Sequence, residues 1–122
     1  MDFLKELKSI IDNEYASIAD EGIATADVTS YISTGSYILN GLLGGSIFSG
    51  LADNKITVFA GEESTGKTWL AIDIVKNFLD AHPSGSVIYF ESEGAISKDM
   101  FQTRGVDTKR VLIVPVDTVQ NF

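Results

Sequence analysis

The chain has 122 residues, 44% of them hydrophobic, which is enough for one small domain and too few for two. It contains no cysteine, which excludes disulfides and thiolate metal sites. Seventeen acidic residues against nine basic ones give a net charge of −8, the wrong sign for wrapping a nucleic-acid backbone. The charged N-terminus does not resemble a signal peptide, and no apolar stretch is long enough for a membrane span. We therefore expect a soluble cytoplasmic protein without membrane contact.

The N-terminal residues 2–19 carry apolar side chains at the three-and-four spacing of a helix, with Asp2 as its N-cap. The apolar stripe of this helix either packs on its own domain or docks on a neighbouring subunit, and composition does not distinguish the two. Residues 21–33 are small and polar and predict a linker. We therefore divide the chain into an N-terminal helix and linker over residues 1–33, a candidate oligomerisation segment, and a core over residues 34–122.

The core alternates helix and strand patterns. Helices are predicted at residues 36–43, 67–79 and 97–105, and strands at residues 56–60, 87–91 and 111–114. Ser97 is the expected N-cap of the last of these helices. Such alternation, with strands that are apolar on both faces, indicates an α/β fold in which helices flank a parallel sheet. Residues 117–122 have the pattern of another turn and helix, and no end signal follows. We therefore expect the core to be truncated at its C-terminus.

Residues 61–68 match the phosphate-binding pattern G-x-x-x-x-G-K-[ST] at every fixed position, between a predicted strand and a predicted helix. We call this segment the candidate phosphate loop; it consists of Gly61, Glu62, Glu63, Ser64, Thr65, Gly66, Lys67 and Thr68. Its glycines let backbone N–H groups turn inward around an anion, and the helix N-terminus adds its dipole. Lys67 is long enough to reach the β- and γ-phosphates, and the Thr68 hydroxyl suits Mg²⁺. The sequence therefore predicts a site for ATP, or a close relative, with Mg²⁺.

Two carboxylates, Glu91 and Glu93, stand at the end of the predicted strand 87–91. Ligands of open parallel sheets bind beyond the carboxyl ends of the strands, so either acid is a candidate to orient the water that hydrolyses ATP. Alternation along an extended chain puts both on the same side, and spacing does not choose between them. Two further interpretations stay open: the acids are solvated, or strand 87–91 or segment 111–117 is the metal-coordinating strand of a compact NTPase.

Three stretches in this order resemble the RecA family: the candidate phosphate loop, residues 89–93, and residues 104–107 before the apolar residues 111–113. The likeness runs from about residue 34 to the end and is greatest to the RecA-like recombinases of tailed phages, the UvsX group. In that family the core binds ATP between subunits of a helical filament on single-stranded DNA, and drives strand exchange in recombination and repair. The resemblance implies DNA-dependent ATPase activity in a full-length protein, located in the host cytoplasm if phage-encoded.

Carried over to this sequence, the resemblance implies that Gly66, Lys67 and Thr68 hold the phosphates and Mg²⁺, with Thr68 as the metal ligand. Lys67 would also assist catalysis. Trp69 follows directly and is included in the nucleotide site. The N-terminal helix would correspond to the segment that packs on the adjacent protomer. The family's DNA-binding loops and its later metal-associated aspartate lie outside this chain.

Glu93 matches the catalytic carboxylate of the family, which activates water, and Glu91 matches the acid two places before it. Met100 stands where the family often places an aromatic that covers the adenine, with Phe101 adjacent. Two alternatives remain: a different motor of the RecA superfamily, such as a hexameric helicase or a clock-type ATPase, or a fragment that binds nucleotide without hydrolysing it. For the isolated chain we expect little or no turnover.

Overall fold

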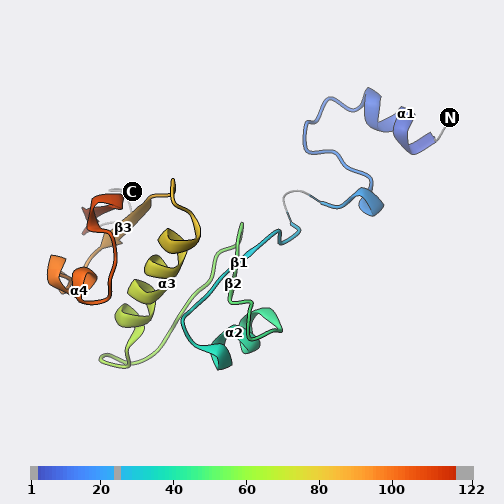
Figure 1. Cartoon of the computed structure of the whole chain (residues 1–122). Helices are drawn as coiled ribbons and strands as arrows, with labels where there is room; N and C mark the ends of the chain where they lie inside the picture. The colour runs from blue at the N-terminus through green and yellow to red at the C-terminus, as the bar shows by residue number, and fades with distance from the viewer. Residues whose placement is uncertain (1–2, 24–25, 118–122) are drawn as a thin grey trace.

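The computed structural model describes residues 3–23 and 26–117, and Figure 1 shows a mixed α/β arrangement. The elements are, in chain order, α1 (Phe3–Ile10), the 3-10 helix η1 (Ala19–Glu21), β1 (Tyr31–Ile32), α2 (Tyr37–Gly44), β2 (Leu51–Ala52), α3 (Lys67–Ala81), β3 (Val87–Glu91), α4 (Lys98–Thr103), the 3-10 helix η2 (Thr108–Arg110) and β4 (Val111–Pro115). β1 and β2 pair antiparallel, whereas β3 and β4 pair in parallel. None of the described helices is long and apolar enough to cross a membrane.

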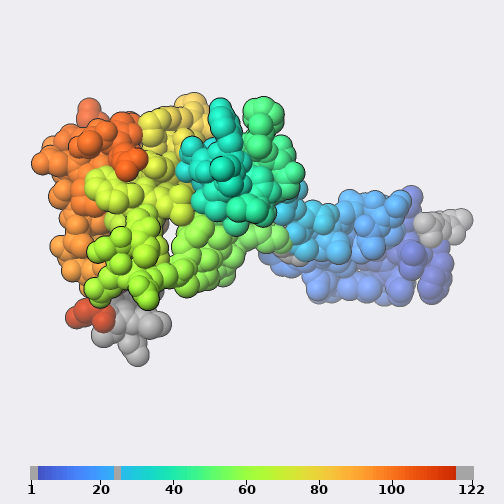
Figure 2. All heavy atoms as spheres, turned by 90° about the horizontal axis from the view of Figure 1, so that it is seen from below, coloured from blue at the N-terminus to red at the C-terminus, as the bar shows by residue number. Residues whose placement is uncertain are grey.

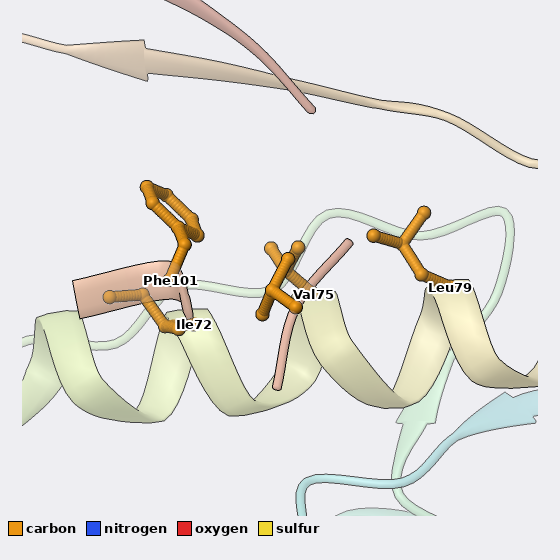
Figure 3. Close-up of a cluster of buried hydrophobic side chains, with 5 residues drawn as sticks. Ile72, Val75, Leu79 and Phe101 are labelled. Carbon is orange, nitrogen blue, oxygen red and sulfur yellow. The ribbon is translucent and has the colours of Figure 1, made fainter. Parts of the chain in front are cut away.

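The hydrophobic core lies between α3 and the β3–β4 pair. Its buried members come from α3, from α4 and from the loop after α4: Ile72, Val75, Leu79, Phe101 and Val106. Ile72, Val75 and Leu79 recur at intervals of three and four residues, so they lie on one side of α3, as Figure 3 shows. β3 adds Val87 and Tyr89, two half-buried residues at alternate positions. The core therefore fixes α3 relative to the end of β3.

Several local predictions are confirmed. Ser97 caps α4, because its hydroxyl accepts a hydrogen bond from the backbone N–H of Met100 at 3.4 Å. A helix also forms near the predicted residues 36–43, as α2; its cap, Ser36, was not predicted and accepts from the N–H of Leu39 at 3.3 Å. β3 and β4 form at the predicted positions and pair in parallel, as expected for strands separated by a crossover helix.

The prediction of a strand at residues 56–60 is wrong. This segment has no regular secondary structure, and its Ile56 and Val58 are 95% and 80% exposed. A strand requires ladder hydrogen bonds to a neighbouring strand. None of the strands in the described part of the chain pairs with this segment. Within the described residues, the expected parallel sheet is therefore limited to β3 and β4.

The N-terminal helix is shorter than predicted. α1 ends at Ile10 instead of residue 19, and Asp2, the expected N-cap, lies outside the described residues. Asn13 favours a turn beyond the helix, because its side chain accepts a hydrogen bond from the backbone N–H of Tyr15 at 2.9 Å. α1 has no buried residue, and Figures 1 and 2 show this N-terminal segment apart from the rest of the chain. Its apolar stripe is therefore left exposed by the chain itself.

Residues 21–33, predicted as a linker, include β1. Asp53, just after β2, accepts hydrogen bonds from the hydroxyls of Thr29 at 2.6 Å and Ser30 at 2.8 Å. The short polar side chains that suggested a linker thus hold the chain before β1 against the end of β2. The further turn and helix expected near the C-terminus fall largely on residues 118–122, which lie outside the described residues.

Candidate functional site

The candidate phosphate loop leads directly into α3, which begins at Lys67. Two of its residues have left-handed backbone conformations, Ser64 with φ 58° and Gly66 with φ 93°. Glycine at position 66 is favoured by this angle and not by lack of space, because a side-chain carbon there would meet no atom within 4 Å. The positive φ values turn the loop tightly into the helix, and the first N–H groups of α3 are left for a ligand or water.

Lys67 lies against its own loop. Its ammonium donates to the backbone carbonyl of Gly61 at 2.7 Å and to that of Glu62 at 2.6 Å. The Thr65 hydroxyl donates to the same Glu62 carbonyl at 2.8 Å. Among the described residues Lys67 forms no ion pair, and its ammonium lies against two carbonyl oxygens instead. Such an ammonium is suited to exchange these carbonyls for an anion.

A cavity of about 440 Å³ opens beside the loop. It is lined by Glu63, Ser64, Thr65, Gly66, Lys67, Thr68, Trp69 and Glu93. All of these residues except Glu93 belong to the loop and the first turn of α3. Glu93 comes from the segment that follows β3. The fold thus brings the carboxylate to the loop, which the sequence could only infer from strand order.

Glu91 and Glu93 occupy different environments, although their spacing made them equivalent. The Glu91 carboxylate accepts hydrogen bonds from the backbone N–H of Glu93 at 2.9 Å and of Gly94 at 2.7 Å. It therefore closes the turn after β3. Glu93 is exposed and lines the loop cavity, from which Glu91 is absent. A smaller cavity of about 160 Å³ has Thr68 and both glutamates among its lining residues, so the two acids are distinguished by the loop cavity and by the hydrogen bonds of Glu91.

Tyr89 lies under this turn, with its side chain half-buried on β3. Burial raises the pKa of the Tyr89 hydroxyl, and the charges of Glu91 and Glu93 raise it further. The phenol is therefore neutral over the whole physiological range. The ring meets Phe101 edge to face, with 5.7 Å between ring centroids, which ties the turn to the core.

The residues available to a metal ion are few. The described residues contain no group of three or more His, Asp or Glu side chains that could hold one. The Thr68 hydroxyl and the Glu93 carboxylate are nevertheless oxygen donors on the same cavity. Mg²⁺ is usually bound through one or two protein oxygens together with phosphate oxygens and water. This donor set fits a magnesium ion that arrives with a phosphate ligand.

Met100, predicted to contact the nucleotide base, is half-buried in α4 and packs against the core cluster. It is not among the residues that line the loop cavity. Trp69, by contrast, lines that cavity from the first turn of α3. The structure thus brings together the candidate phosphate loop, Trp69 and Glu93, and leaves Met100 apart from them.

Sequence reasoning missed two residues that support Trp69. The guanidinium carbon of Arg104 lies 4.7 Å from the centroid of the Trp69 ring. One Arg104 nitrogen, Nη1, is also 3.2 Å from each carboxylate oxygen of Asp73. Trp69 and Asp73 are four residues apart on α3, a spacing that places them on one side of the helix. The sequence spacing could have indicated that Trp69 and Asp73 are neighbours, but it could not have indicated that Arg104, just after α4, contacts both.

The α/β arrangement and the loop at the start of α3 agree with the comparisons with known proteins. The RecA N-terminal domain model matches residues 4–121. The chain belongs to the RecA N-terminal domain family.

Curated relatives are bacterial proteins named Protein RecA. The one from Acidothermus cellulolyticus is 36% identical over 101 residues, covering 83% of this chain and 27% of that protein. The Nocardia farcinica protein is 38% identical over 89 residues, covering 73% of this chain and 24% of that protein. The Rhodococcus jostii protein is 36% identical over 87 residues, covering 71% of this chain and 24% of that protein. The chain thus spans about a quarter of the length of these relatives.

Proposed function

We propose that this chain is the ATP-binding portion of a RecA-like DNA recombinase. In the whole protein, DNA-dependent ATP hydrolysis would support filament formation on single-stranded DNA and strand exchange in recombination and repair. One observation carries the proposal: Glu93 lines the same cavity as Lys67 and Thr68 of the candidate phosphate loop. Membership of the RecA N-terminal domain family supports it.

In this proposal the phosphates lie at the N-terminus of α3, where unpaired N–H groups and the positive end of the helix dipole favour anions. Lys67 gives up its bonds to the carbonyls of Gly61 and Glu62 and binds phosphate oxygens instead. The exchange is favourable because the ammonium then lies against an opposite full charge, whereas each carbonyl offers only a dipole. The Thr68 hydroxyl is the protein ligand of Mg²⁺, which neutralises phosphate charge when it is bound.

Glu93 acts as the general base. Its carboxylate orients a water molecule toward the terminal phosphate and accepts the water proton as the new phosphorus–oxygen bond forms; the bond from that phosphorus to the bridging oxygen breaks, and ADP leaves with the bridging oxygen. Glu91 is a positioning residue, because its two hydrogen bonds hold the turn from which Glu93 projects. The two carboxylates, which alternation along the strand could not distinguish, thus have separate roles.

The partners of the whole protein are also part of the proposal. Residues 1–33 serve in self-association into a helical filament, which agrees with the exposed apolar stripe of α1. The net charge of −8 agrees with contacts to single-stranded DNA being made by regions outside this chain. The likeness to the phage UvsX group belongs to the proposal as well, and it rests on the order of the motifs.

The division of the chain at residue 34, with the ATP-binding core over residues 34–122, is a prediction.

A second candidate, nucleotide binding without turnover, is favoured by the segment that leads into the loop. Residues 56–60 pair with no described strand, so the loop is held firmly on its α3 side only. Catalysis requires reacting groups to be placed within about 1 Å of their productive positions. We therefore expect the 122-residue chain by itself to bind ATP and to hydrolyse it slowly or not at all.

The test is thermal unfolding of the chain with Mg-ATP, with Mg-ADP and without nucleotide. ATP at about a hundred times its dissociation constant adds roughly 2.7 kcal/mol to the free energy of unfolding. We expect a clear rise in melting temperature that Lys67→Ala abolishes. The matched control is Lys55→Ala, which removes an exposed lysine outside the cavity and leaves the rise intact. An unchanged nucleotide affinity in Lys67→Ala would refute the assignment of the loop.

A further inference from the structure

The loop cavity has one aromatic wall. Of the described residues that line it, only Trp69 carries an aromatic ring, and the others are polar residues and one glycine. The Trp69 residue is 39% exposed, so part of its surface remains open to a ligand. It lines the same cavity as Lys67 and Thr68, so the ring shares this cavity with a ligand whose phosphates occupy the candidate phosphate loop.

The ring is held in place before any ligand binds. Arg104, at the end of α4, stacks its guanidinium on the indole, with 4.7 Å between its central carbon and the ring centroid. Asp73 holds the same guanidinium through both carboxylate oxygens, each 3.2 Å from Nη1. Because three side chains from α3 and α4 fix one another, less conformational entropy is lost when a planar group stacks on the indole.

The residue expected to contact the base does not line the loop cavity. Met100 packs on the core cluster, next to Phe101, which is 3% exposed. Trp69, by contrast, lines this cavity.

We infer that Trp69, positioned by Arg104 and Asp73, is the stacking platform for the base of a nucleoside triphosphate in the loop cavity. The inference rests on the proposed function, because it assumes that the triphosphate occupies the candidate phosphate loop. Stacking uses the face of a base and not its hydrogen-bonding edge, so it tolerates different bases. The site therefore takes purine nucleoside triphosphates as a class, binding ATP and GTP similarly and the smaller pyrimidine rings more weakly.

Isothermal titration of the 122-residue chain tests this inference with four probes: Mg-ATP, Mg-GTP, Mg-CTP and Mg-tripolyphosphate. Removal of a base–aromatic stack weakens binding by roughly tenfold or more. We expect Trp69→Leu to raise the dissociation constant of ATP and GTP by that factor and to leave that of tripolyphosphate unchanged. Phe48→Leu is the matched control, because Phe48 is 83% exposed and does not line the cavity.

Arg104 has its own test. Arg104→Met removes the cation and keeps an apolar stem, so it should weaken ATP binding and not tripolyphosphate binding. Arg104→Lys keeps a cation over the ring and should restore part of the loss. A merely structural role would lower the affinity for both probes together.

A readout without substitution comes from fluorescence, because Trp69 is the single tryptophan of the chain. ATP should change its emission, and tripolyphosphate should change it far less. Equal affinity of the wild type for ATP and tripolyphosphate, or an unchanged ATP affinity in Trp69→Leu, would overturn the platform and leave the phosphate site standing. Failure of the wild type to bind either probe would overturn the proposed function together with the platform.

Discussion

The separation of Glu91 from Glu93 leads to a pair of substitutions with opposite expected effects. Glu93→Gln removes the proposed general base, whose contribution is on the order of 100- to 10,000-fold in rate. At about 1.36 kcal/mol for each factor of ten, the activation barrier rises by about 3 to 5 kcal/mol. Because Glu93 is exposed and its side chain closes no turn, the free energy of unfolding should stay within about 0.5 kcal/mol of the wild type.

Glu91→Gln should lower the stability of the fold and affect the rate of hydrolysis much less. The Glu91 carboxylate accepts from two backbone N–H groups, at 2.9 and 2.7 Å, and an amide offers only one oxygen to them. One bond is lost and an NH₂ group meets a backbone N–H. The site is half-exposed, so the cost is about 1 kcal/mol of stability. Hydrolysis should fall less than tenfold.

The assay is ATP hydrolysis by the complete protein, with and without single-stranded DNA, together with urea unfolding of each variant. Nucleotide affinity should be retained in both variants. If Glu91→Gln abolished hydrolysis and Glu93→Gln did not, the assignment of the base to the cavity-lining carboxylate would be wrong. Glu91 would then be the general base.

Two further predictions concern stability. Ile72 is fully buried, so Ile72→Ala should lower the free energy of unfolding by about 2 to 5 kcal/mol, measured by urea unfolding. Ile38→Ala, at a position that is 78% exposed, should change it by less than about 0.5 kcal/mol, and equal losses would refute the assigned core. Hydrogen bonds from the Thr29 and Ser30 side chains lower the pKa of Asp53 from 3.8 to about 2. Because the pKa is lower in the folded state, Asp53 contributes stability above its unfolded pKa, and this contribution is lost as the pH falls through about 2. Asp53→Asn should therefore be less stable than the wild type at pH 5, with the difference shrinking toward pH 2 in thermal melts.

The sequence predicted the features that depend on neighbouring residues. Ser97 marked the start of α4, because a cap uses the backbone N–H three residues later. The apolar strands β3 and β4 formed where their composition indicated. The order of motifs also identified the RecA family, whose N-terminal domain model matches residues 4–121.

Features that depend on distant partners were not predictable in this way. Residues 56–60 have a strand's composition, but pairing requires a neighbour that local composition does not supply. Glu91 and Glu93 share a spacing, and only the turn that Glu91 closes distinguishes them. The stack of Arg104 on Trp69 joins two residues that are far apart in the sequence, and no periodic pattern predicts it.

The unpaired segment 56–60 also bears on how this chain behaves in concentrated solution. Its Ile56 and Val58 are two residues apart and highly exposed. Ile88 on β3 and Leu112 on β4 are apolar and exposed as well, at 61% and 59%. Exposed apolar chain with free backbone N–H and C=O groups is a template for pairing with another molecule. The segment that leads into the candidate phosphate loop is therefore one place where aggregation of this chain would start.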